Sequence, residues 1–100
     1  MARVILETTQ PHTPDTGILG KDWYGEYQLT LEVAGTTPVI LQRRVAPDRE
    51  WKNARFNSTD ISLSAEGDTL DVKLARDFDY RCLTETAGAE VWIAKHNPHD

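Results

Sequence analysis

Large apolar residues occupy nearly every second position between residues 23 and 33. They are Trp23, Tyr27, Leu29, Leu31 and Val33, with Gly25 at the remaining alternate position, and polar residues fill most of the positions between them. A period of two places one set against a core and the other in water, whereas a helix would need apolar residues at spacings of three and four. This stretch therefore predicts a long, half-buried β-strand.

Turn residues end this strand and separate it from further strand-like segments. A turn containing Gly35 and Pro38 leads into Val39 to Val45, and a hairpin turn at Glu66 to Asp68 leads into the alternating stretch of Leu70, Val72 and Leu74. The other predicted strands are residues 2–7, 61–63, 80–85 and 89–95, the last two being joined as a hairpin at Ala87 and Gly88.

No segment has a convincing helical pattern, so the sequence predicts an all-β fold. About seven short strands at regular spacing favour an antiparallel β-sandwich. A small β-barrel or a jelly roll would give the same local signals. One hundred residues with 39% apolar content supply one core, so we expect a single domain over residues 1–100 with a flexible polar tail at 96–100.

The segment 8–21 shows little alternation and predicts an extended arm or long loop between the first two strands. Pro11 and Pro14 cannot donate to a strand ladder, and connections of this length are usually functional or disordered. We expect the arm to order against a neighbouring subunit, with Ile18 and Leu19 as its apolar anchor.

Charge and composition exclude several classes of partner. The net charge of −5 disfavours nucleic acid, whose phosphate backbone needs a cationic surface. The apolar run at Val4 to Leu6 is too short for a membrane span or a signal-peptide core, and one cysteine forms no internal disulfide. We therefore expect no membrane partner and synthesis in a reducing cytoplasm.

The residues typical of an active site do not converge in the sequence. All three histidines lie in the predicted arm and tail, where no strand would hold them beside a nucleophile. Cys82 takes an apolar-facing strand position, which is typical of a small buried side chain. Asp77 and Asp79 are the best candidate cation ligands, although a solvated turn explains them more simply. We expect no enzymatic activity, no metal and no cofactor.

Trp51 is the strongest candidate contact residue. It lies in an irregular, charged segment, and large amphipathic rings are common at binding surfaces. Arg49 beside it belongs to the basic concentration of Arg43, Arg44, Arg49 and Arg55, which could pair with an acidic protein surface. Trp23 and Trp92 fit a core position between two sheets better.

The segment Asp77 to Cys82 resembles the penultimate strand of immunoglobulin-like domains, because Tyr80 stands two residues before Cys82. In that family the tyrosine hydroxyl bonds back to the chain at a corner. The resemblance implies an immunoglobulin-like sandwich, although the cysteine expected in an earlier strand is absent.

A second resemblance covers most of the chain. Small β-proteins of tailed-phage virions combine four features, which are here the strand from Trp23 to Val33, Leu41-Gln42-Arg43, the loop Asp48-Arg49-Glu50-Trp51, and Tyr80-Arg81 followed by Gly88. The resemblance implies a structural virion protein, of the capsid decoration or cement type, that binds capsid protein and copies of itself. A head-fibre, tail or connector component, or a carbohydrate- or protein-binding module, is the alternative.

Overall fold

All regular structure in the described part of the chain is β-strand. The computed structural model describes residues 3–6, 8–10, 17–20, 23–56, 58–85 and 88–95. Its longest strand, β3 (Gly25–Val33), buries Tyr27, Leu29 and Leu31, and the residues that alternate with them are exposed or half-buried. The prediction of an all-β fold is confirmed, and so is a half-buried strand at this position, although it begins at Gly25 and Val33 is exposed.

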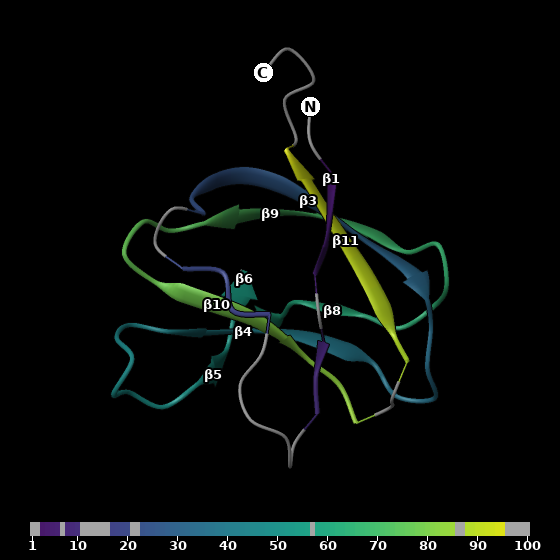
Figure 1. The fold of residues 1–100 in the computed structure, drawn as a ribbon, viewed down its shortest axis with the longest axis horizontal. Helices are drawn as coiled ribbons and strands as arrows, with labels where there is room; N and C mark the ends of the chain where they lie inside the picture. The colour runs from purple at the N-terminus through teal and green to yellow at the C-terminus, as the bar shows by residue number, and fades with distance from the viewer. Residues whose placement is uncertain are drawn as a thin grey trace.

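Four strands form the first sheet, in the order β1-β11-β3-β9 (Figure 1). β1 (Arg3–Leu6) and β9 (Thr69–Leu74) are its outer strands, and β11 (Glu90–Lys95) and β3 lie between them. All three pairings are antiparallel.

The second sheet is mixed and is centred on two antiparallel strands, β4 (Val39–Arg44) and β10 (Asp79–Leu83). The short strand β2 (Thr8–Thr9) pairs with β10 in parallel, while β5 (Lys52–Asn53) and β8 (Ser62–Leu63) pair with β4. β6 (Arg55–Phe56) and β7 (Thr59–Asp60) form a separate two-stranded hairpin between β5 and β8. The described residues thus contain eleven strands, and each of the seven predicted segments overlaps one of them.

At several steps along the chain, consecutive strands lie in different sheets. β3 leads to β4, β8 to β9, β9 to β10, and β10 to β11, and each step changes sheet. The predicted hairpins at Glu66 to Asp68 and at Ala87 and Gly88 are therefore wrong, since the strands on either side of them pair elsewhere. Alternation reports which face of a strand is buried, and it carries no information on the strand's partner.

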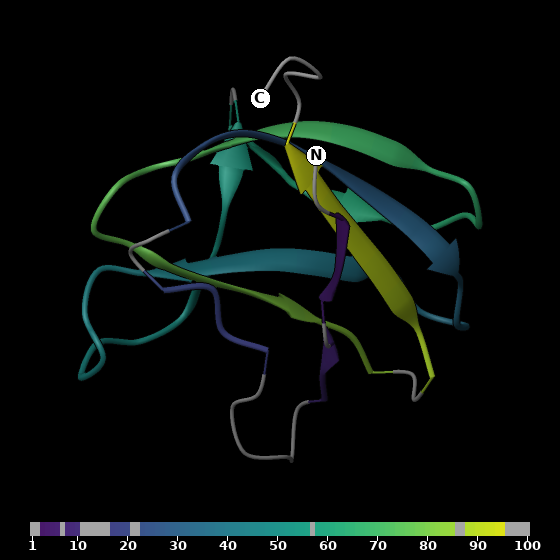
Figure 2. The same ribbon diagram turned by 45° about the horizontal axis from the view of Figure 1, so that its top comes forward.

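The two sheets face each other across one apolar cluster, and they do not close into a barrel (Figure 2). The first sheet contributes Leu29, Leu31, Val72 and Ile93, among others, and the second contributes Val39, Leu41, Tyr80 and Cys82. Trp23 packs against this cluster, whereas Trp92 is half-buried on the side of β11 away from Val91 and Ile93.

Tyr80 links the core to the turn between β9 and β10. Its side chain is 4% exposed, and its hydroxyl oxygen accepts a hydrogen bond of 2.8 Å from the backbone N–H of Ala75. The turn also holds Asp77 at a positive φ of 73°, a backbone conformation that residues other than glycine adopt rarely. The Tyr80 hydroxyl therefore fixes the start of a tight connection between the two sheets.

Tyr80→Phe should destabilise the protein by about 1 kcal/mol, the typical net value of one hydrogen bond. Tyr27→Phe is the matched control, because Tyr27 is also buried but belongs to β3, outside the turn between β9 and β10. Chemical denaturation of both variants measures the difference. Equal unfolding free energies for the two would show that the Tyr80 hydroxyl does not hold the turn.

Candidate functional site

The side of the second sheet that faces away from the core carries an ordered group of polar and aromatic side chains. Along β4 and β10, Leu41, Tyr80 and Cys82 point into the core, so the residues between them point outward. We call this surface the outer face, and it comprises Gln42, Arg44, Trp51, Asn53, Asp79 and Arg81. The strand register places Arg44 opposite Asp79 and Gln42 opposite both Arg81 and Asn53.

Trp51 lies at the centre of the outer face, in contact with two guanidinium groups. The Cζ atom of Arg44 is 4.5 Å from the centroid of the indole ring, and that of Arg81 is 4.4 Å from it. Each distance is within the range of a cation–π interaction. The indole itself is half-buried, so part of it remains accessible to a partner.

Both arginines are held in place by hydrogen bonds across the sheet. Arg44 donates from Nε to Asp79 Oδ2 at 2.9 Å, and these two side chains are only 14% and 20% exposed. Arg81 donates from Nε to Gln42 Oε1, also at 2.9 Å. The charged groups around Trp51 are therefore fixed before any partner arrives, which lowers the entropy cost of binding.

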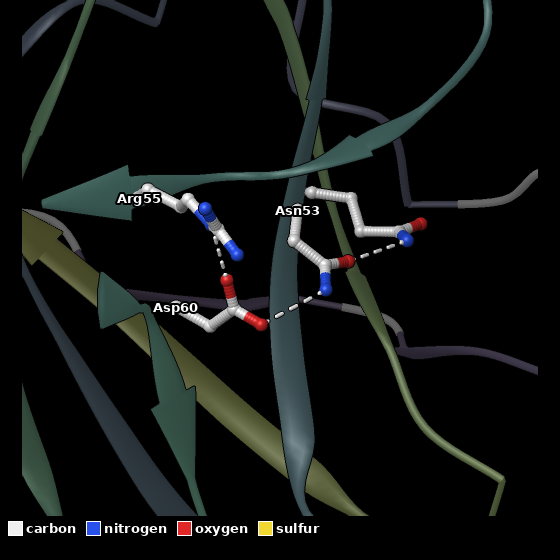
Figure 3. A network of polar contacts seen from close by, with 4 residues as sticks. Asn53, Arg55 and Asp60 are labelled. Carbon is white, nitrogen blue, oxygen red and sulfur yellow. Dashed lines mark hydrogen bonds and ion pairs between the residues drawn. The ribbon is translucent and has the colours of Figure 1, made fainter. Parts of the chain in front are cut away.

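The polar network continues from the outer face to the β6–β7 hairpin. Gln42 donates to Asn53 at 3.0 Å, Asn53 donates to Asp60 at 3.1 Å, and Arg55 donates to Asp60 at 2.9 Å. Figure 3 shows the carboxylate of Asp60 between the side chains of Arg55 and Asn53. Hydrogen bonds from Arg55, and then from Asn53, lower the pKa of Asp60. These groups are exposed, so the network orients side chains more than it adds stability.

This region is basic within an acidic protein. Residues 39–60 together with β10 contain six of the chain's 11 lysines and arginines but only four of its 16 acidic residues. All other positions together hold five basic and twelve acidic residues. The excess of cations is therefore local, although the whole chain carries a net charge of −5.

The predicted contact residues Trp51 and Arg49 lie at and beside the outer face. Arg49 is exposed in the connection between β4 and β5. It lines a cavity of about 320 Å³ together with Arg43, Val45, Asp48, Glu50 and Lys52. Sequence reasoning missed Arg81 and Gln42, although both follow from the period of two, since they alternate with the core residues Leu41, Tyr80 and Cys82.

The described ends of the predicted arm belong to the fold of their own chain. β2 pairs with β10, and Leu19 forms an antiparallel bridge with Tyr80. Leu19 is 6% exposed and packs in the core, so it is not accessible to a neighbour, whereas Ile18 is 37% exposed. Pro11 and Pro14 lie outside the described residues, as does the predicted tail at 96–100.

The described residues contain neither a cluster of metal-binding side chains nor a membrane-spanning helix. In residues 3–6, 8–10, 17–20, 23–56, 58–85 and 88–95, no three His, Cys, Asp or Glu side chains lie close enough to hold a metal ion. Asp79, one of the two candidate cation ligands, forms an ion pair with Arg44. The same part of the chain contains no helix long and apolar enough to cross a membrane.

Cys82 should resist thiol reagents in the folded protein. It is buried, and desolvation raises the pKa of its thiol from 9.0 to about 12, so the reactive thiolate is scarce. At pH 8 we expect labelling by a disulfide reagent only as fast as the chain unfolds, and complete labelling in denaturant. The chain has one cysteine, so the signal has one source. Faster labelling of the folded protein would show that the thiol is accessible.

The same pKa shift predicts the sign of a pH effect on stability. Above pH 9 the unfolded chain loses the thiol proton while the folded chain keeps it until about pH 12. In this range the folded state binds more protons than the unfolded state. The stability that the protonated Cys82 thiol contributes is therefore lost as the pH rises from about 9 to about 12. Cys82→Ala should remove that part of the alkaline destabilisation, and unfolding free energies of both proteins across the range measure it.

Comparisons with known proteins assign the chain to no family. No protein-family model matches it, and no curated protein or solved structure is significantly similar to it. Its function has to be argued from the outer face and from the fold that displays it.

Proposed function

We propose that the protein is a non-enzymatic structural component of a tailed-phage virion that binds the capsid surface as a decoration or cement protein. The observation that carries the binding role is Trp51 in contact with Arg44 and Arg81 on the outer face. The virion assignment rests on the sequence resemblance. It would place the protein in the virion after synthesis in the host cytoplasm.

The composition of the outer face supports a protein partner. Tryptophan and arginine are the residue types most enriched among those that dominate binding energy at interfaces. The two guanidinium groups beside the indole ring make this surface charged, which favours an acidic protein over an uncharged carbohydrate. A local excess of cations fits an acidic protein surface.

The strand order supports a jelly-roll form of the β-sandwich rather than the immunoglobulin form. In an immunoglobulin sandwich the last strand lies beside the penultimate one, whereas here β11 lies between β1 and β3. Consecutive long strands alternate between the two sheets, as they do when a jelly roll wraps around its core. The Tyr80 hydrogen bond resembles the immunoglobulin corner, and the parallel pairing of β2 with β10 departs from a regular jelly roll.

Jelly rolls occur in viral capsid proteins and in lectins. The fold is therefore compatible with the virion role and with the carbohydrate-binding alternative, and the charged groups beside the indole ring argue for the first. A head-fibre, tail or connector component would use the outer face in the same way and would differ only in the protein that it contacts.

Trp51→Ala should weaken attachment to capsids of the encoding phage by about tenfold or more, the loss expected of a central contact residue. It should cost only about 1–2 kcal/mol of stability, because the indole is half-buried and each of the two lost cation–π contacts contributes about 0.5–1 kcal/mol. Co-sedimentation with capsids that lack the protein measures attachment, and denaturation measures stability.

Trp92→Ala is the matched control. Trp92 is also half-buried, but it belongs to the other sheet, where its indole N–H donates to Glu90 at 2.7 Å. We expect this variant to bind capsids normally, and we expect attachment of the native protein to weaken as salt is added. Equal attachment of the two variants would contradict the proposed site, and no attachment of the native protein to any capsid component would contradict the virion role.

A further inference from the structure

β9 is an outer strand of the first sheet, whereas Trp51 directly precedes β5 of the second sheet. In the described part of the chain it pairs with one strand only, β3. An outer strand presents backbone N–H and C=O groups along its second side, and these can pair with a strand from another chain. The edge of β9 is therefore a candidate interface between proteins.

A cavity of about 400 Å³ lies along β9. Leu70 and Val72 of β9 line it, together with Tyr27 of the neighbouring strand β3. Arg55 and Ile61, from the region of the β6–β7 hairpin, contribute further lining. The first sheet and the β6–β7 region therefore both border the space next to β9, with apolar and charged groups.

The charges of β9 in one copy of the chain are complementary to those of β9 in a second copy. Asp71 and Lys73 are exposed on either side of the buried Val72. When two such strands run antiparallel about a two-fold axis at Val72, each Asp71 stands opposite the Lys73 of the other copy. Opposite charges facing each other across an antiparallel pair are stabilising, and like charges are destabilising.

We propose that a second copy of this chain pairs with the first through β9, joining the two first sheets into one continuous sheet. The pairing is symmetric, as in most homodimers. Moving the two-fold axis to Asp71 or to Lys73 would bring like charges together, and a shift by one residue would turn Val72 to the wrong face. The charges of β9 thus favour the register with the axis at Val72. They also disfavour pairing with an unrelated strand whose charged side chains all have the same sign.

Charge reversal at β9 tests this pairing. Asp71→Lys and Lys73→Asp each place like charges at both ends of the interface, so each variant alone should dimerise about tenfold more weakly than the native chain. Sedimentation velocity over a concentration series measures the dissociation constant. Circular dichroism checks that both variants remain folded, as expected because both side chains are exposed.

Two combinations then separate pairing at β9 from a general charge effect. When the two single variants are mixed, every heterodimer sets the two lysines of one β9 strand opposite the two aspartates of the other, so the mixture should dimerise as well as the native protein. The double variant Asp71→Lys/Lys73→Asp is again self-complementary and should also recover. A native protein that stays monomeric at every concentration, or single variants that dimerise normally, would overturn the proposal.

Pairing through β9 does not depend on capsid binding. Trp51→Ala changes the other sheet and should leave the dimerisation constant unchanged. A loss of dimerisation in that variant would place the interface at the outer face and would also overturn the proposal. Failure of the native protein to bind capsids would leave the sedimentation result intact, so the two proposals can fail separately.

Discussion

The antiparallel pairing of β4 with β10 is the contact on which both the core and the outer face depend. On one side it buries Leu41, Tyr80 and Cys82. On the other side it sets Arg44 against Asp79 and Arg81 against Gln42. A slip of one residue in either strand would exchange its two faces, placing charged groups in the core and apolar side chains on the surface. Burial of the apolar set thus fixes the register, and the register fixes the guanidinium groups that contact Trp51.

β10 also holds the first part of the chain in place. β2 pairs with it in parallel at Cys82 and Leu83, and the chain then reverses so that Leu19 meets Tyr80 in the antiparallel sense. Buried Thr84 adds a polar connection: its N–H donates to the carbonyl of Thr9 at 3.0 Å, and its hydroxyl lies 3.2 Å from that of Thr37. Because a buried polar group is costly when it lacks a hydrogen bond, these contacts favour one arrangement of the first strands.

The sequence was sufficient to predict strands and their buried faces, because a period of two is a local property. It was insufficient to predict their partners. The turn at Glu66 to Asp68 has the composition of a hairpin, with Gly67 at a positive φ of 91°, yet it connects β8 and β9 of different sheets. The same limit applies to the outer face. Trp51 was recognisable from its charged surroundings, but its contacts with Arg44 and Arg81 depend on the register between β4 and β10, which lie far apart in the chain.

The two proposed contact surfaces belong to different sheets and use different chemistry. The outer face offers side chains held by hydrogen bonds, whereas the edge of β9 offers backbone groups and uses Asp71 and Lys73 to choose a register. Pairing at β9 therefore does not cover the outer face of either copy in the dimer. A dimer with two identical faces binds a repetitive surface more tightly than one copy can, provided that the spacing of sites on that surface matches the spacing of the faces. Such a gain needs no new contact, so a small domain with one central tryptophan could attach firmly to an ordered shell while each single contact stays weak.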